Sequence, residues 1–305
     1  MSYAGEVKAE LCRGKLSRKC CALAEAAGVL LYCSRFDLGQ VRIVTESGPF
    51  AQRLPPLFRR AFGARFDRTG DPDAPGKQVF VLEDREQLRQ VWDQCAFDPS
   101  DPAHHINFGL LEEDHCRLSF LRGCFLAGGS VTDPRKGYHL ELATTHRSVS
   151  RELDALLLDL GYEPKVTERK GSYVTYFKQS EAIEDLLTAI GAPVSAMELM
   201  NAKAEKLLRN GVNRRVNCEA ANVEKTVDAA LEQRRAIRTL RERGLLKDLS
   251  PKLKEAARLR EENPELSLSQ LAELCVPKVT KSSLNHRLQK LSALSREAEE
   301  EPAKQ

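Results

Sequence analysis

Two apolar, glycine-bearing segments of similar composition constrain the fold of this 305-residue chain more than any other feature. Residues 118–131 read LSFLRGCFLAGGSV, a pattern that predicts an apolar helix running directly into a strand. Residues 20–34, CCALAEAAGVLLYCS, are a weaker copy with Gly28 in the place of Gly123. Glycine inside a helix costs about 1 kcal/mol relative to alanine and is retained where another backbone comes close. We therefore expect Gly28 and Gly123 to lie at the interface between two tightly packed helices.

The elements predicted around these two helices follow the same order in each half. The predicted strands are residues 35–38, 41–45, 64–68 and 78–82, and then residues from 131 onward, 138–144, 163–169 and 173–178. Corresponding positions lie 95–99 residues apart, which indicates a divergent internal duplication. The order αββαββα, repeated, predicts an α+β fold with two antiparallel sheets, each covered by helices on one face. The opposite faces are expected to form a groove.

The C-terminal third has a different character, because from Ala196 onward it is almost wholly helical and rich in arginine. The predicted domains are residues 1–96 and 97–192 for the two repeats, 193–248 for a helical linker and 249–305 for an all-α domain. The linker is expected to contain two helices separated by a dense polar stretch at residues 213–222. Its notable residues are Arg214, Arg215, Asn217 and Asn222. They could hold the linker against a domain by buried hydrogen bonds, which we favour, or contact the DNA backbone.

A short helix, a turn and a second helix at residues 267–291 follow a supporting helix at 251–262, which is the outline of a helix-turn-helix. Between residues 278 and 296 there are five Lys and Arg residues and no Asp or Glu. Most of the remaining polar side chains of this segment should face outward. The candidate DNA-binding residues are Thr280, Lys281, Ser282, Ser283, Asn285, His286, Arg287, Gln289 and Lys290.

The residue types in this segment suit nucleic acid. Hydroxyl groups at a helix N-terminus favour phosphate, and Asn285, Arg287 and Gln289 can hydrogen-bond base edges. A solvated basic face of a three-helix bundle fits the pattern equally well. The absence of acidic residues and the hydroxyl-rich helix start favour DNA.

Composition and residue spacing predict that the chain has no membrane segment, signal peptide, metal site or cofactor. The formal net charge of +3 is too small to indicate a polyanionic partner by itself, and no apolar run reaches membrane-spanning length. The N-terminus lacks a signal-peptide pattern, so we expect a cytoplasmic protein with no membrane partner. The nine cysteines are scattered without a Cys-x-x-Cys pair, and His104, His105 and His115 have no partners at metal-ligand spacing. We expect no structural metal and no cofactor.

The paired glycine motifs resemble the LAGLIDADG motif of homing endonucleases. Together with NRRVNCEAANVEKT at residues 213–226 and SLSQLAELCVPKVTKSSLNHRLQKL at residues 267–291, they make the chain resemble the WhiA family, sporulation and cell-division regulators of Gram-positive bacteria. The resemblance implies a LAGLIDADG-like domain joined by a helical linker to a helix-turn-helix that binds promoters in double-stranded DNA. It further implies a role in cell division, chromosome segregation and sporulation, and an association with the nucleoid. A protein partner such as a sigma factor or another regulator is also expected.

The resemblance also allows a test of catalysis. In active LAGLIDADG nucleases each motif ends in an acidic residue that binds the catalytic metal, since hard cations prefer oxygen ligands. Alignment of the glycines places Cys33 and Gly128 at these positions, and neither supplies a carboxylate. We expect no nuclease activity and no catalytic residue. A divergent endonuclease, and a scaffold that binds a protein or effector with DNA binding secondary, remain as alternatives.

Overall fold

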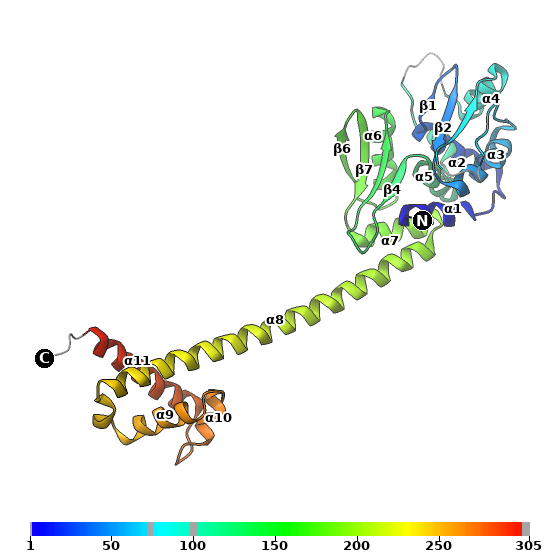
Figure 1. Cartoon of the computed structure of the whole chain (residues 1–305). Helices are drawn as coiled ribbons and strands as arrows, with labels where there is room; N and C mark the ends of the chain where they lie inside the picture. The colour runs from blue at the N-terminus through cyan, green and yellow to red at the C-terminus, as the bar shows by residue number, and fades with distance from the viewer. Residues whose placement is uncertain (1, 72–75, 98–102, 301–305) are drawn as a thin grey trace. The chain divides into compact units, whose positions relative to one another are not determined.

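The computed structural model describes residues 2–71, 76–97 and 103–300. The chain forms two compact units, Met1–Leu207 and Leu208–Gln305 (Figure 1). Each unit has its own apolar core. The first unit combines sheets and helices, and the second is helical. The α+β class predicted from the duplicated pattern is therefore confirmed.

The first half of unit 1 contains a three-stranded antiparallel sheet in the order β1-β2-β3. Its elements are α1 (Tyr3–Cys12), α2 (Lys19–Tyr32), β1 (Arg35–Phe36), β2 (Val41–Thr45), α3 (Gly48–Phe62), β3 (Gln78–Leu82) and α4 (Arg85–Cys95). The predicted strand at residues 64–68 is wrong as a full strand, because only Arg68 forms an isolated bridge, to Val81. The Asp67 carboxylate instead accepts the backbone N–H groups of Glu83 and Asp84, which holds this segment at the start of α4.

The second half contains a four-stranded antiparallel sheet in the order β4-β5-β7-β6. Its elements are η1 (Phe108–Leu110), α5 (Asp114–Gly128), β4 (Gly129–Val131), β5 (Leu140–Thr144), α6 (Arg147–Asp159), β6 (Lys165–Arg169), β7 (Ser172–Phe177) and α7 (Ser180–Ile190). The predicted hairpin is confirmed: β6 and β7 pair around Lys170 and Gly171, which adopt φ values of +52° and +76°. Residues 72–75 and 98–102, from the predicted turn and connector, lie outside the described residues.

Helices α2 and α5 pack against each other at the centre of unit 1 (Figure 1). They run in the same direction, because Cys21 lies beside His115 and Glu25 lies beside Gly123. A Cβ atom at Gly28 would lie 2.3 Å from the Phe120 carbonyl oxygen, and one at Gly123 would lie 2.0 Å from that of Glu25. Most of the other residues of the two helices are buried in the unit 1 core. The close approach of two backbones therefore requires glycine at both positions.

The proline pair in α3 does not interrupt that helix. α3 is continuous from Gly48 to Phe62 although it contains Pro55 and Pro56. Ser47 caps its start, and Gly63 ends it in the left-handed conformation with φ +74°. The helix buries one apolar face against the core, and this burial compensates for the backbone hydrogen bonds that proline cannot donate.

The predicted two-helix linker is also wrong. Residues 193–242 form one helix of 50 residues, α8 (Pro193–Glu242), which includes the whole polar stretch 213–222. The stretch contains arginine, glutamate and alanine, which are strong helix formers, and it contains no proline. η2 (Leu245–Asp248), α9 (Pro251–Glu262), α10 (Leu268–Glu273) and α11 (Lys281–Glu300) complete unit 2. In the described part of the chain, no helix combines the length and the apolar character needed to cross a membrane.

Candidate nucleic-acid interface and the LAGLIDADG-like centre

Helices α10 and α11 form the helix-turn-helix, with α9 packed against α11. α10 starts with a capping box: the Ser267 hydroxyl accepts from the Gln270 backbone N–H, and the Gln270 side chain accepts from the Ser267 N–H. At the start of α11, the Thr280 hydroxyl accepts from the Ser283 N–H at 3.2 Å. Residues of these three helices and of the C-terminal part of α8 form the unit 2 core, which includes Ile237, Leu253, Leu271, Leu284 and Leu288. The core fixes which face of α11 remains accessible.

The accessible face of α11 carries most of the predicted DNA-binding residues. Those exposed are Thr280, Lys281, Ser282, Ser283, His286, Gln289 and Lys290, and Asn285 is half-buried. Residues four apart lie on one side of a helix, so Ser282, His286 and Lys290 form one row. Lys281, Asn285 and Gln289 form the row beside it. We call these two rows the α11 face.

Arg287 does not belong to the α11 face. Its Nη1 lies 3.3 Å from the Glu255 carboxylate of α9, and only 14% of its side chain is exposed. Glu255 also accepts the Val276 backbone N–H at 2.8 Å, so one carboxylate holds both α11 and the preceding turn. In place of the base-edge donor expected from the sequence, the structure shows a residue that joins α9 to α11.

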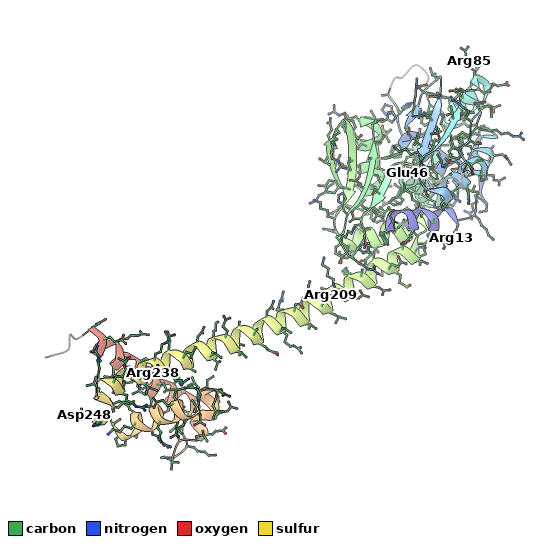
Figure 2. The ribbon with its side chains drawn as sticks, in the orientation of Figure 1. Arg13, Glu46, Arg85, Arg209, Arg238 and Asp248 are labelled. Carbon is green, nitrogen blue, oxygen red and sulfur yellow. The ribbon has the colours of Figure 1, made fainter. Side chains whose placement is uncertain are left out.

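The positions of the polar residues in stretch 213–222 of α8 also differ from expectation. Arg214, Arg215, Asn217 and Asn222 are all exposed along α8, so the expected buried hydrogen bonds to a domain are wrong. Figure 2 shows side chains projecting outward along α8 beyond the labelled Arg209. The described contact of Asn222 is local, from its Nδ2 to the Cys218 sulfur at 3.7 Å. Contact of these residues with the DNA backbone, the other alternative, stays a prediction.

In unit 1 the two positions aligned with nuclease acids lie at the C-terminal ends of α2 and α5. The Cys33 thiol is placed to donate to the carbonyl oxygens of Leu30 and Arg35, each at 3.1 Å. Burial raises the pKa of the Cys33 thiol to about 12, with opposing backbone hydrogen bonds. At Gly128 a Cβ atom would lie 2.5 Å from the Ala143 carbonyl oxygen. The first position holds a neutral thiol, and the second has no room for any side chain.

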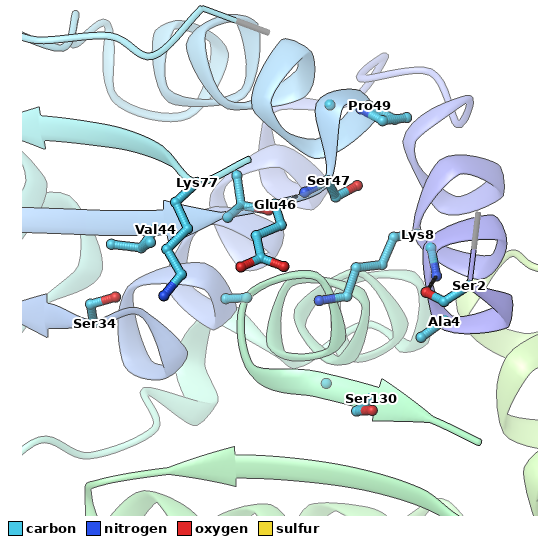
Figure 3. Close-up of a pocket in the computed structure, with 15 residues that line it drawn as sticks. Ser2, Ala4, Lys8, Ser34, Val44, Glu46, Ser47, Pro49, Lys77 and Ser130 are labelled. Carbon is cyan, nitrogen blue, oxygen red and sulfur yellow. Dashed lines mark hydrogen bonds between the residues drawn. The ribbon is translucent and has the colours of Figure 1, made fainter. Parts of the chain in front are cut away.

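A cavity of about 690 Å³ lies near these helix ends, between α1, the start of α3 and β4 (Figure 3). Its polar lining includes the hydroxyls of Ser34, Ser47 and Ser130 and the charged groups of Lys8, Glu46 and Lys77. Burial lowers the pKa of Lys8 to about 8, and its Nζ lies 6.0 Å from the centre of the Phe125 ring. Sequence reasoning missed this site, because its residues come from distant segments and form no motif.

At the N-terminal ends of α2 and α5, four side chains from distant parts of the sequence lie close together. Cys20 and Cys21 from α2 and His115 and Cys116 from α5 place their sulfur and nitrogen atoms within 4.8 Å of one another. The expectation that His115 lies without matching ligands is therefore wrong. Residues 94 to 96 apart are not found by a search for local ligand spacing.

Comparison with known proteins agrees with the two-part architecture. Residues 117–209 match the family model of the WhiA LAGLIDADG-like domain, and residues 212–295 match that of the WhiA C-terminal HTH domain. A relative from Ruminiclostridium cellulolyticum, named "Probable cell division protein WhiA", is 37% identical over 304 residues, covering 97% of each chain. A relative of the same name from Heliobacterium modesticaldum is 36% identical, covering 97% of this chain and 96% of its own.

The fold is also found among solved structures. The crystal structure of full-length WhiA from Thermatoga maritima superposes with a TM-score of 0.60 at 24% identity, covering 97% of this chain and 99% of that one. A crystal structure of the N-terminal LAGLIDADG domain of WhiA gives a TM-score of 0.50 at 21% identity, covering 62% of this chain and 89% of that one. The family models and the sequence relatives cover both units, and the chain belongs to the WhiA family.

Proposed function

We propose that this chain is a DNA-binding protein that acts in cell division, with α11 as its recognition helix on double-stranded promoter DNA. The observation that carries the proposal is the α11 face, which is polar and basic and lies within a segment without acidic residues from 278 to 296. The domain that bears it matches the WhiA C-terminal HTH domain, and the sequence relatives are named as probable cell division proteins.

The α11 face supplies two kinds of DNA contact. In a helix-turn-helix, residues near the start of the second helix reach base edges in the major groove. Asn285 and Gln289 offer amides that suit adenine, and Lys281 and Lys290 offer charges that suit phosphates. Ser282 and Ser283 lie at the helix N-terminus, where backbone N–H groups favour a phosphate oxygen.

The biological role that we attach to this interface is transcriptional regulation of genes for cell division, chromosome segregation and sporulation. Such a role would place the chain at the nucleoid. A regulator that binds promoters also meets the transcription machinery, so a protein partner such as a sigma factor or another regulator is part of the proposal.

Unit 1 is proposed to keep the LAGLIDADG scaffold without nuclease activity. Support comes from Cys33, whose thiol is neutral at physiological pH, and from Gly128, where no carboxylate fits. Hard metal ions in phosphodiester cleavage need closely placed oxygen ligands, which these two positions lack.

A second candidate function rests on the cavity in unit 1. Two ammonium groups and five hydroxyl-bearing residues against one carboxylate, that of Glu46, favour a small anionic effector. In this alternative the chain is a protein- or effector-binding scaffold of cell division, and DNA binding is secondary. A thermal-shift screen with anionic metabolites on the full chain and on a Lys8→Ala variant would detect it.

The test of the first proposal is genome-wide crosslinking of the full chain carrying Asn285→Ala and Gln289→Ala together. The matched control is Lys252→Ala, which removes an exposed charge from α9. We expect promoter enrichment to disappear in the double variant and to persist in the control. Unchanged enrichment in the double variant would mean that α11 does not read the DNA.

A further inference from the structure

We propose that Cys20, Cys21, His115 and Cys116 bind one thiophilic divalent cation, of which Zn²⁺ is the best match, and that this ion joins the two repeats of unit 1. The proposal concerns a site separate from the DNA-binding helix and from the cavity, and it does not depend on the proposed function. We call the four residues the Cys3His cluster.

The donor set is the first argument. Three thiols and one imidazole form a set typical of structural zinc sites, which are four-coordinate and tetrahedral. Bond lengths of about 2.0–2.3 Å to nitrogen and sulfur imply ligand atoms roughly 3.5–3.8 Å apart in a tetrahedron. Here the His115 Nδ1 lies 3.5 Å from the Cys21 sulfur and 3.1 Å from the Cys116 sulfur, and all four ligand atoms lie within 4.8 Å of one another. Closing the shell requires side-chain shifts of about 1 Å.

The duplication explains why these side chains converge. Cys20 and His115 are each the second residue of their helix, and Cys21 and Cys116 are each the third. Both pairs are 95 residues apart, the same separation as that of Gly28 and Gly123. Because Gly28 and Gly123 allow the backbones of α2 and α5 to approach closely, the first turns of the two helices lie side by side. Each helix then contributes two donor atoms.

The cluster lies at the N-terminal ends of two helices. Burial, and then the neighbouring Cys20 and Cys21, raise the pKa of the Cys116 thiol, so its deprotonation is coupled to the binding of a cation. Both helices begin without a side-chain cap, since neither Arg18 nor Glu113 makes a side-chain capping hydrogen bond in the structure. The N-terminal turn of a helix carries partial positive charge, which favours a thiolate over a thiol. Cys116 is buried and Cys20 is exposed, so the cluster has a fixed inner side and a route for an ion to enter from solvent. A structural site needs both a rigid shell and an entry path.

The expected consequence is mechanical. A cation held by two donors from α2 and two from α5 fixes the N-terminal ends of the helices whose middles are already in contact at the glycines. Metal binding to the folded chain adds to the free energy of unfolding, because the unfolded chain does not hold the four ligands together. The ion would stabilise unit 1 and leave the α11 face unchanged.

The experiment uses the full-length chain, purified under reducing conditions, freed of metal and titrated with Co²⁺ and then Zn²⁺. We expect one Co²⁺ per chain, with the visible absorption of tetrahedral cobalt and a thiolate-to-cobalt charge-transfer band, and displacement by Zn²⁺. Cys20→Ser removes a ligand and should weaken Zn²⁺ affinity, measured by competition with a chromophoric chelator, by at least the roughly 10–100-fold that loss of a second-shell partner costs. The matched control is Cys218→Ser, an exposed cysteine on α8, which should leave affinity unchanged.

Melting temperature provides a second readout. A chelator should lower the melting temperature of the zinc-loaded wild-type chain and of Cys218→Ser, and should have little effect on Cys20→Ser. Cys20 is exposed, so its substitution should preserve folding, which circular dichroism would check. Failure of the reduced chain to bind either ion would overturn the proposal. So would an unchanged cobalt spectrum and affinity in Cys20→Ser, or a disulfide between cluster cysteines with no ion bound.

Discussion

The Arg53 guanidinium donates to the Glu25 carboxylate in the interior of unit 1, with its Nε 2.5 Å from Oε1 and its Nη2 2.9 Å from Oε2. The side chains of Arg53 and Glu25 are 4% and 1% exposed. Arg122, from α5 in the second repeat, lies 3.4 Å from the same carboxylate. Glu25 therefore joins α2, α3 and α5, and it does so next to the glycine contact between the two central helices.

Removal of this carboxylate should be strongly destabilising. Glu25→Ala leaves the buried Arg53 without a counter-charge, which typically costs 3–5 kcal/mol of the free energy of unfolding. Urea denaturation followed by circular dichroism would measure the change. The control is Glu83→Ala, which breaks the exposed Arg68–Glu83 pair and should cost less than about 1 kcal/mol. Equal losses in the two variants would contradict the assignment of a buried network.

Substitution of Gly123 should distinguish the effect of packing on the free energy of unfolding from the effect of helix propensity. In Gly123→Ala the new methyl group meets the Glu25 carbonyl, and we expect a loss of about 1–3 kcal/mol from overpacking. In the control Gly211→Ala, on α8, a Cβ atom meets nothing within 4 Å, so helix propensity should stabilise the chain by up to about 1 kcal/mol. We expect the changes in the free energy of unfolding, measured with denaturant, to have opposite signs in the two variants. Changes of the same sign would refute the close approach of the helices.

The α11 face should bind DNA with a marked salt dependence. Each of Lys281→Ala and Lys290→Ala should weaken binding across all DNA sequences and reduce the slope of log affinity against log salt by about 1. Fluorescence anisotropy with duplex DNA at several salt concentrations gives both quantities. Lys252→Ala on α9 is the control and should leave the slope unchanged, whereas a slope unaffected by either α11 variant would exclude phosphate contact there.

The chain should not cleave DNA. Supercoiled plasmid incubated with the protein and Mg²⁺ should remain supercoiled, because Cys33 and Gly128 supply no carboxylate. Agarose gels with an active nuclease as a positive control would show this. Gly128→Asp should lose stability rather than gain activity, since its Cβ atom would lie 2.5 Å from the Ala143 carbonyl. Nicking by the wild-type chain that disappears in a point variant would overturn the interpretation.

Stability should fall in mild acid because of His146. Burial, and secondarily the nearby His104, lower the pKa of His146 from 6.5 to about 4. Between these values the unfolded chain binds a proton that the folded chain does not, so the free energy of unfolding decreases as pH falls from 6.5 to 4. The imidazole is only partly buried, so solvent screening limits the decrease to roughly 1–2 kcal/mol.

Chemical denaturation at a series of pH values would test this contribution. His146→Asn should flatten the dependence between pH 6.5 and 4, because it removes the titrating group. The control His286→Asn, on the exposed face of α11, should keep the wild-type dependence. A dependence that survives unchanged in His146→Asn would assign the effect to other groups.

Features that depend on local pattern can be predicted from the sequence alone. The paired glycines, the strand alternation of Val41–Thr45 and the apolar stripe of α11 follow from period and composition, so the duplicated α+β unit and the helix-turn-helix could be predicted. The exposed residues of the α11 face could be named for the same reason, since the stripe that is buried leaves the others outward.

Features that depend on partners distant in the chain follow from the tertiary structure and not from the sequence pattern. The sequence predicts Arg287 as a DNA contact, whereas the structure pairs it with Glu255, 32 residues away. The sequence predicts a break at the polar stretch 213–222, yet α8 is continuous there, because side-chain polarity does not break a helix that lacks proline. The Cys3His cluster exists only because two helices 95 residues apart pack in parallel at Gly28 and Gly123, and local spacing carries no record of that contact.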